Sequence, residues 1–156
     1  MVTGNLETDY PLFVLGMPRS GTKLLRGILN QHSTIAIPSI ETEFFPYWVA
    51  NLRRFGDLSE FPNFKRFVEH MNRYPFFGYL AESGNVPETR SWYDRCENFT
   101  AADIFEAMIK EVVRFEPSRH RIWGDKSPSY LAHIELLTEH FPKARFIHIV
   151  RDVRDY

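Results

Sequence analysis

The chain has 156 residues, of which 44% are hydrophobic and 25% are charged, so its length and composition are those of one globular domain. These values exclude a disordered segment, a collagen-like fibre and a coiled coil as descriptions of the whole chain. The 19 Lys and Arg residues nearly balance the 20 Asp and Glu residues, and the net charge of -1 argues against a generic binder of nucleic acid or anionic membranes. The single cysteine, Cys96, excludes an internal disulfide and a multi-cysteine metal cluster.

The N-terminus shows no targeting segment. Residues 1–10 contain no Lys or Arg and lack the basic start and apolar run of a secretory signal. No stretch approaches the roughly 18 consecutive apolar residues of a membrane span. We therefore predict a soluble, cytoplasmic protein with no membrane or nucleic-acid partner, in which residues 1–10 are an N-terminal tail and residues 11–156 form one domain. The sequence carries no sign of its oligomeric state.

The domain opens in the order strand, glycine-bearing turn, helix, strand. Residues 12–15 are an apolar run bounded by turn residues, which is typical of a strand covered on both faces of a parallel sheet. A helix is predicted to begin near residues 21–22, and its apolar side chains share one face: Leu24, Leu25, Ile28 and Leu29. Residues 35–37 are a second short strand. This order predicts an α/β fold.

The remaining elements are predicted from capping signals and periodicity. Residues 44–79 hold half of the aromatic side chains, and we expect short helices there whose rings fill the core. Thr100 starts a capping box, which predicts a helix to about Glu116. A short strand at residues 121–123 precedes a helix over residues 127–141, and residues 146–150 are the last strand.

The turn after the first strand is a candidate anion site. It consists of Gly16-Met17-Pro18-Arg19-Ser20-Gly21-Thr22-Lys23. Backbone amides at a helix N-terminus point outward without partners, the helix dipole is positive there, and a glycine lets an anion approach closely. The alternative is a tight turn with solvated basic residues, but the coincidence of motif and context favours an anion site.

The spacing of Gly16 and Gly21 matches a Walker A loop, which continues Gly-Lys-(Ser/Thr). Here the lysine stands one position later, at Lys23, which swings it by about 100° around the helix. Leu24 occupies the position after that lysine and has no hydroxyl for magnesium. These departures weaken an ATPase or kinase interpretation.

The segment from Pro18 to Thr22 resembles the 5′-phosphosulfate loop of sulfotransferases that use 3′-phosphoadenosine 5′-phosphosulfate (PAPS). It is most similar to the branch of tyrosylprotein sulfotransferases and bacterial relatives, from which Lys23 departs. The resemblance implies a P-loop-containing nucleotide-hydrolase-like three-layer fold with a central parallel sheet. It also implies a set of residues that hold the 5′-phosphosulfate through side chains or amides: Arg19, Ser20, Gly21, Thr22, Lys23 and Leu24.

Two further matches imply catalytic residues. Glu41-Thr42 is similar to the family segment whose glutamate is the catalytic base, with Glu43 as the second candidate and Thr42 as an orienting residue. Taken alone, Glu41 is a helix-start carboxylate. Asp125-Lys126-Ser127-Pro128 resembles the family's (D/E)K(S/T)P segment, in which the lysine reaches the transferring sulfuryl group. Taken alone, Lys126 is a surface lysine beside a capped helix.

The final match is the last strand and the Arg151-Asp152-Val153-Arg154-Asp155 run, which resembles the family's 3′-phosphate-binding strand and turn. Arg151 would grip the 3′-phosphate, and Arg154 is expected to be a paired surface charge. The family pattern places a serine at position 159, after Tyr156. We therefore expect the chain to be the N-terminal portion of a sulfotransferase domain, truncated after this strand.

The function expected from the resemblance is sulfuryl transfer from PAPS to a hydroxyl or amine acceptor, with Glu41 as base, Arg19 and Lys126 neutralising the transition state, and no metal. Residues 44–79 would contribute to the acceptor pocket. Two alternatives stay open: a P-loop kinase that uses Mg–ATP on a small metabolite, and a non-catalytic fragment that retains nucleotide binding. The acceptor is not specified by the sequence.

Overall fold

The computed structural model describes residues 10–152 and residue 154. The predicted tail therefore lies outside the described residues except for its last position, Tyr10, which begins the first strand. Val153 and Asp155 of the C-terminal run also lie outside the described residues.

Four strands form one parallel sheet, as predicted. They are β1 (Tyr10–Gly16), β2 (Ile35–Ala36), β3 (Ile122–Lys126) and β4 (Arg145–Ile149). Their order is β2-β3-β1-β4, and every neighbouring pair is parallel. The carboxyl ends of all four strands therefore meet at one edge of the sheet, where open α/β sheets bind ligands.

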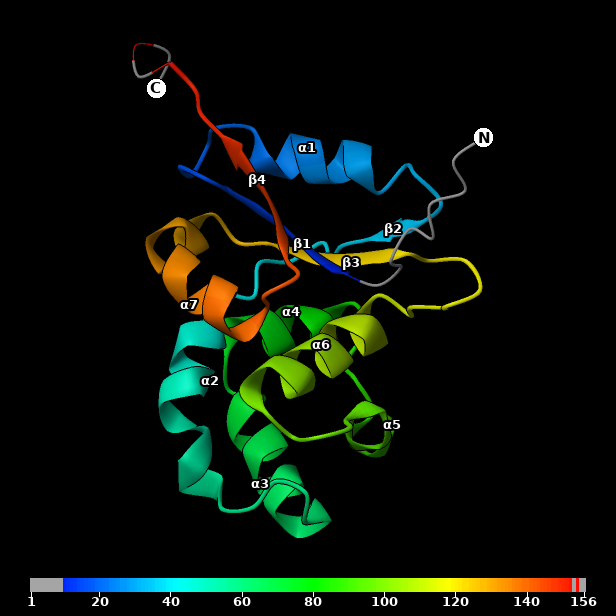
Figure 1. Ribbon diagram of the computed structural model, residues 1–156. Helices are drawn as coiled ribbons and strands as arrows, with labels where there is room; N and C mark the ends of the chain where they lie inside the picture. The colour runs from blue at the N-terminus through cyan, green and yellow to red at the C-terminus, as the bar shows by residue number, and fades with distance from the viewer. Residues whose placement is uncertain (1–9, 153, 155–156) are drawn as a thin grey trace, which may run out of the picture.

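Helices cover the two faces of this sheet unequally, which produces three layers (Figure 1). One helix, α1 (Thr22–Leu29), lies on one face, and the other helices lie on the opposite side. The latter are α2 (Phe45–Asn51), α3 (Phe61–Met71), α4 (Pro75–Glu82), α5 (Thr89–Arg95), α6 (Ala101–Val112) and α7 (Ile134–His140), with 3₁₀ helices at Leu52–Phe55 and Pro128–His133.

The alternation of side chains along β1 divides the core into two clusters. Leu12 and Val14 face α1 in a small cluster, whereas Phe13 and Leu15 face the larger one. The larger cluster contains most of the aromatic rings of residues 44–79, such as Trp48, which stacks on Phe44 at 4.7 Å between ring centroids. Core filling by this segment is confirmed.

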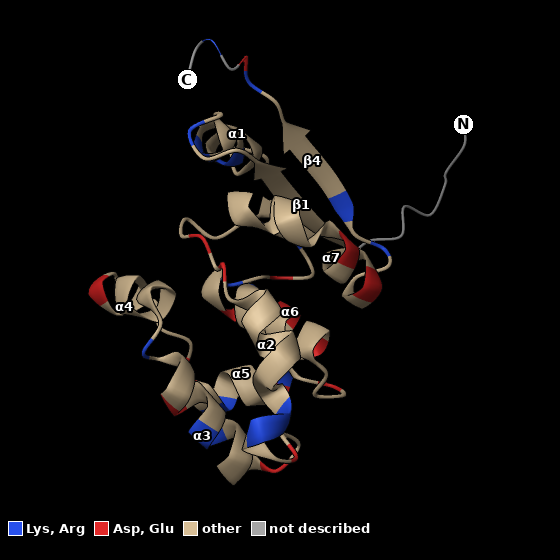
Figure 2. Ribbon diagram, turned by 90° about the vertical axis from the view of Figure 1, so that its left-hand side faces the viewer, with Lys and Arg blue, Asp and Glu red and all other residues tan. Residues whose placement is uncertain are grey.

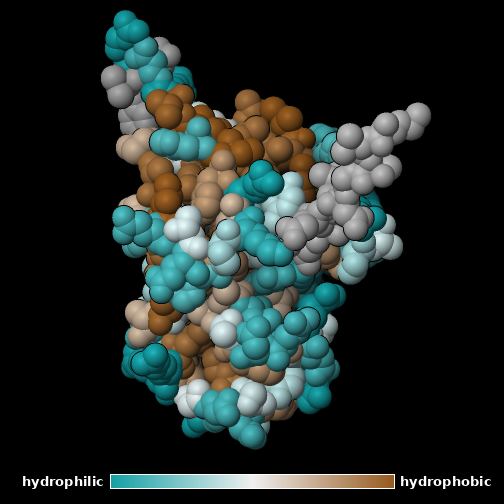
Figure 3. Space-filling model, in the orientation of Figure 1, coloured by the Kyte–Doolittle hydropathy of each residue, from teal (hydrophilic) through white to brown (hydrophobic). Residues whose placement is uncertain are grey.

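The single apolar face predicted for α1 is buried only in part. Leu25 and Leu29 pack against the small cluster, but Leu24 and Ile28 are 71% and 58% exposed. Figure 3 shows hydrophobic residues at the surface over this helix. The reason is geometric: a helix on the sheet buries one narrow stripe, and the adjacent pair of side chains points away from it.

The structure differs from the prediction in two helices. The capping box at Thr100 forms, with the Asp103 amide donating to its hydroxyl at 3.3 Å, but α6 ends at Val112 rather than near Glu116. Arg114 adopts a left-handed conformation with φ 52°, which breaks the helix. The helix predicted over residues 127–141 is a 3₁₀ helix followed by α7, so its axis is not continuous.

Candidate functional site

A cavity of about 980 Å³ lies at the carboxyl end of the sheet. We call it the crevice. Its lining brings together the loop after β1, most of the length of α1, the segment after β2, the start of the Pro128–His133 helix and the residue two positions after β4. Figure 2 shows basic positions at α1 and acidic positions on the segments below it, on the same side of the molecule. Residues far apart in the sequence therefore share one site.

The loop of residues 17–21 is held close to the sheet by Gly16. A Cβ atom on Gly16 would lie 2.8 Å from the Ile149 carbonyl oxygen and 2.9 Å from Ser20 Oγ, so only glycine fits. Arg19 and Gly21 adopt positive φ angles of 66° and 108°, which turn the chain sharply into α1. No side chain caps this helix start, and its first amides point into the loop.

Ser20 and Thr22 are buried in this loop, with 8% and 4% of their surface exposed. Among the described residues, nothing accepts from or donates to Ser20 Oγ. A buried hydroxyl without a partner costs free energy unless a ligand satisfies it. Together with the open amides and the helix dipole, this hydroxyl makes the loop suited to a tetrahedral anion.

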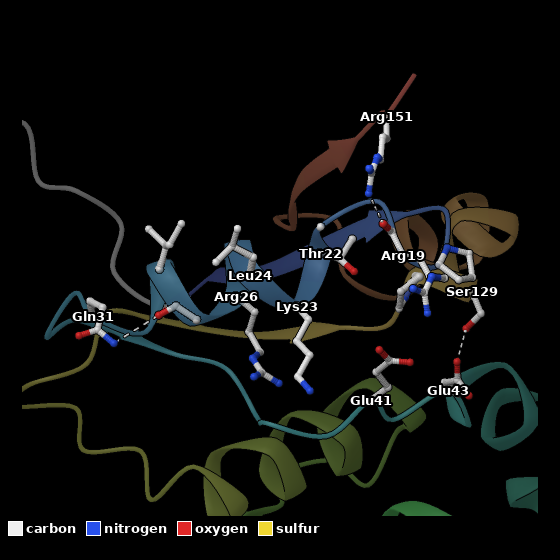
Figure 4. Close-up of a pocket in the computed structure, with 15 residues that line it drawn as sticks. Arg19, Thr22, Lys23, Leu24, Arg26, Gln31, Glu41, Glu43, Ser129 and Arg151 are labelled. Atoms are coloured by element: carbon white, nitrogen blue, oxygen red, sulfur yellow. Dashed lines mark hydrogen bonds between the residues drawn. The ribbon is translucent and has the colours of Figure 1, made fainter. Parts of the chain in front are cut away.

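Basic side chains from α1 and from the residues after β4 line the crevice. Lys23 and Arg26 project from α1 toward the segment that carries Glu41, and Arg151 approaches Arg19 from β4 (Figure 4). The Arg151 Nη1 atom donates to the Arg19 carbonyl at 3.3 Å. Leu24 also lines the crevice but presents an apolar side chain to it. The crevice therefore has anion-binding groups at the loop and at the end of β4.

Glu41 and Lys126 form an ion pair at the edge of the crevice. The Lys126 side chain is 3% exposed, while that of Glu41 is 40% exposed and lines the crevice. Lys126 stands at the end of β3, three residues beyond the strand predicted over 121–123. The pair places a basic oxygen and a buried cation next to each other.

Glu43, the second candidate for a base, points elsewhere. Its Oε1 atom accepts from Ser129 Oγ at 3.3 Å, and its backbone has a φ of 58°. Both glutamates line the crevice, and the ion pair with the buried lysine is formed by Glu41. The choice between Glu41 and Glu43 as the base stays a prediction.

Thr42, between these two glutamates, is fixed by a buried polar network. Its amide donates to Ser127 Oγ at 3.0 Å, and its hydroxyl lies 3.2 Å from Asp125 Oδ2 and 2.8 Å from the Tyr130 hydroxyl. Desolvation raises the pKa of Asp125 to about 7, although hydrogen bonds from Ser127 and Thr42 and the charge of Lys126 oppose this shift. These contacts fix Thr42 in place, and its role in orienting the site stays a prediction.

Sequence reasoning missed several residues of the site. Arg26 and Gln31 line the crevice, and the Arg26 guanidinium contacts the Ser39 carbonyl. Arg26 lies three positions after Lys23 and so shares its helix face, which is the signal that could have revealed it. Tyr130 lies within the helix predicted over residues 127–141, and nothing in its local sequence indicates that its hydroxyl reaches Thr42 and the Phe45 amide.

A second cavity, of about 650 Å³, adjoins the crevice and shares Lys23, Glu41 and Glu43 with it. Lys126 also lines this cavity. The rest of its wall is largely aromatic, and we call it the aromatic pocket: Phe44, Tyr47, Tyr74, Phe76 and Tyr79. The ion pair of Glu41 and Lys126 thus lies where the two cavities meet.

Neither a metal centre nor a membrane span is present in the described part of the chain. No three His, Cys, Asp or Glu side chains gather among residues 10–152 and 154 as a metal site requires. None of the helices that these residues form is long and apolar enough to cross a bilayer.

In the C-terminal run, the expectation that Arg154 is a paired surface charge is confirmed. Arg154 forms an ion pair with Asp152 at 2.5 Å, and its side chain is 84% exposed. The hydrogen bonds from Arg154 lower the pKa of Asp152. Arg154 is therefore a paired surface charge, and Arg151 is the arginine of this run that lines the crevice.

Comparisons with known proteins give one family. An uncharacterized protein of Aquifex aeolicus is 30% identical over 145 residues, which are 93% of this chain but 16% of that protein. The crystal structure of the sulfotransferase STF9 from Mycobacterium avium matches with a TM-score of 0.42 and 22% identity, covering 93% of this chain and 43% of that one. A sequence profile described as sulfotransferase family matches residues 11–156. The chain therefore belongs to the sulfotransferase family.

Proposed function

We propose that this chain binds PAPS in the crevice and transfers its sulfuryl group to a hydroxyl acceptor. The observation that carries this proposal is the meeting of four separate segments at one edge of the sheet. The loop after β1, Glu41, Lys126 and Arg151 all reach the two adjoining cavities. Family membership gives the reaction class, and these residues supply the groups that it needs.

The residues of the crevice fit a nucleotide with phosphate-type groups at both ends. In the loop that borders the crevice, the buried Ser20 hydroxyl lacks a partner among the described residues, and no side chain caps the amides at the start of α1. Arg19, Thr22 and Lys23 add donors for the 5′-phosphosulfate. Arg151, which stands at the other side of the loop, would bind the 3′-phosphate through its planar guanidinium.

In the proposed reaction, Glu41 takes the proton of the acceptor hydroxyl as the acceptor oxygen bonds to sulfur. The bond between sulfur and the 5′-phosphate oxygen breaks, and adenosine 3′,5′-bisphosphate leaves with the electron pair. Lys126 and Arg19 stabilise the charge that moves to the leaving oxygen. The scheme derived from these side chains uses no metal.

The aromatic pocket is the proposed acceptor site. It opens beside the Glu41 carboxylate, and its rings are backed by the core because Phe44 and Phe76 are almost fully buried. A hydroxyl held in this pocket would lie next to both the base and the donor. Cys96 is half-buried and is the single cysteine of the chain. This low cysteine content fits the cytoplasm, which we propose as the compartment.

A calorimetric titration tests the proposed function. We expect adenosine 3′,5′-bisphosphate to bind without magnesium, and Mg–ATP to bind more weakly. Selective binding of Mg–ATP with no response to the bisphosphate would instead support the kinase alternative and overturn the proposal.

A transfer assay then separates an enzyme from a nucleotide-binding remnant. The chain spans 43% of the matched sulfotransferase structure. Sulfate transfer is therefore measured separately from nucleotide binding. We expect radiolabelled PAPS to lose its sulfate to water or to naphthol, used here as a probe. Bisphosphate binding without either transfer would identify a non-catalytic remnant.

A further inference from the structure

Four polar side chains are buried around the backbone that directly follows Glu41. Thr42 is 4% exposed, and the other three are completely buried. We call them the Thr42 clamp: Thr42, Asp125, Ser127 and Tyr130. All except Thr42 belong to the segment that includes Lys126, the partner of Glu41. One short stretch of chain thus supplies both the buried cation and the groups around the base.

The clamp holds the backbone at Thr42, Glu43 and Phe45, the last of which begins α2. Ser127 Oγ accepts from the amides of Thr42 at 3.0 Å and of Glu43 at 3.4 Å. The Tyr130 hydroxyl lies 2.8 Å from Thr42 Oγ1 and accepts from the Phe45 amide at 3.0 Å. Residues 41–44 belong to no helix or strand. The clamp contacts therefore hold this backbone in place of the hydrogen bonds of regular secondary structure.

Holding the loop with the clamp costs free energy, because the clamp buries polar groups. Asp125 is buried, and its Oδ1 atom has no hydrogen-bond partner among the described residues. Buried polar groups contribute little net stability compared with apolar packing of the same shape. Their directional contacts do fix geometry, and a loop whose next residue, Glu43, has a φ of 58° needs such contacts. A requirement for orientation therefore explains the clamp better than stability does.

We propose that Thr42, Asp125, Ser127 and Tyr130 are positioning residues that hold the Glu41 carboxylate against Lys126 and toward the acceptor. This inference rests on the function proposed above. Thr42 is 4% exposed and also lines the aromatic pocket, but in this proposal the clamp residues act through the backbone of residues 41–45. When the clamp is loosened, Glu41 remains present but loses its alignment, so the chemical step slows while nucleotide binding is retained.

Isosteric variants test the clamp with little risk to folding. Thr42→Val and Tyr130→Phe remove hydroxyls and keep the packing shape. We expect sulfate transfer from radiolabelled PAPS to water or naphthol to fall by about 10- to 100-fold, while adenosine 3′,5′-bisphosphate affinity stays within about twofold. Thr42→Ser keeps the hydroxyl and restores most of the rate. Thr138→Val and Tyr93→Phe, in α7 and α5, are the matched controls and leave the rate unchanged.

The double variant Thr42→Val with Glu41→Gln separates positioning from a general structural effect. If the clamp acts through Glu41, the double variant is no slower than Glu41→Gln alone. Independent, multiplying losses would overturn the proposal, as would a wild-type rate in Thr42→Val. A wild-type chain that neither binds the bisphosphate nor transfers sulfate would instead contradict the proposed function. In that case, hydrogen exchange at the Thr42 and Phe45 amides still decides whether the clamp holds this loop: exchange unchanged in Thr42→Val and Tyr130→Phe would overturn it.

Discussion

Lys126 contacts the carboxylate of Glu41 although 85 positions separate the two residues in the sequence. The lysine is buried and the glutamate faces the crevice, so the pair connects the interior of the sheet to the site. A buried charge that loses its partner is destabilising. The pair therefore affects both the stability of the fold and the chemistry of the site. A conservative substitution can separate these two effects.

Glu41→Gln keeps the shape of the side chain and removes its basic oxygen. We expect sulfate transfer to fall by about 100-fold or more, because general-base catalysis contributes roughly that much. Bisphosphate affinity, measured by calorimetry, should change little. Glu43→Gln decides between the two candidates: a larger loss in that variant than in Glu41→Gln would assign the base to Glu43.

Arg151→Ala tests the site of the 3′-phosphate. Charge-assisted hydrogen bonds contribute about 1.5–3 kcal/mol, so affinity for adenosine 3′,5′-bisphosphate should fall by about 10- to 100-fold. Affinity for adenosine 5′-phosphate, which lacks the 3′ group, should stay nearly constant. Arg154→Ala is the matched control, since Arg154 is exposed and paired with Asp152. Equal losses for both nucleotides in Arg151→Ala would contradict the assignment.

Tyr79→Ala tests the aromatic pocket. Tyr79 is 56% exposed at its wall, so its removal should leave the fold intact. Aromatic contacts of this kind contribute about 0.5–1.5 kcal/mol, and we expect the KM for naphthol to rise by about two- to tenfold with unchanged bisphosphate affinity. Tyr10→Ala, at the opposite end of the sheet, is the control. An unchanged KM in Tyr79→Ala would place the acceptor elsewhere.

The sequence allowed the central fold to be predicted because its signals are local. The apolar run of β1, the glycine turn and the start of α1 follow from neighbouring residues alone. The end of β3 does not follow from neighbouring residues, since Gly124-Asp125-Lys126 has the composition of a turn. These residues form a strand because Gly124 fits against the backbone of Leu12 and because the polar partners of Asp125 come from a distant segment.

The residues of the site also divide into those that short motifs predict and those whose contacts depend on distant segments. Arg19, Glu41, Lys126 and Arg151 were predicted from short motifs, and the structure brings them to one edge of the sheet. The contacts of Thr42 with Tyr130 could not be predicted, because they depend on how two loops 88 positions apart are packed. Which half of the α1 apolar face is buried could not be predicted either, because periodicity does not say how wide a stripe the sheet covers.

Gly124→Ala should destabilise the sheet directly beside the site. A Cβ atom at Gly124 would lie 2.2 Å from the Leu12 carbonyl oxygen of the paired strand, so β1 and β3 would have to separate. We expect a loss of about 3 kcal/mol or more in the free energy of unfolding, measured with urea. Gly78→Ala is the matched control: it lies in α4 with open space around it and should gain about 0.5–1 kcal/mol. Equal effects of the two substitutions would contradict the close approach.

Asp125 should make the stability of the protein depend on pH. Its pKa is raised from 3.8 to about 7, so between these values the folded chain binds a proton that the unfolded chain releases. The free energy of unfolding therefore falls as pH rises through this window, by up to about 4 kcal/mol. The charged or titratable groups that act on this carboxyl are Lys126, Glu41 and Tyr130.

Asp125→Asn removes this titration and keeps the side-chain shape. Relative to the wild type, the variant should be least stable at and below about pH 4 and should gain relative stability steadily up to about pH 7, because only the wild type then buries a carboxylate. Urea unfolding of both proteins at three pH values measures the difference. A difference independent of pH would show that Asp125 has an ordinary pKa despite its burial.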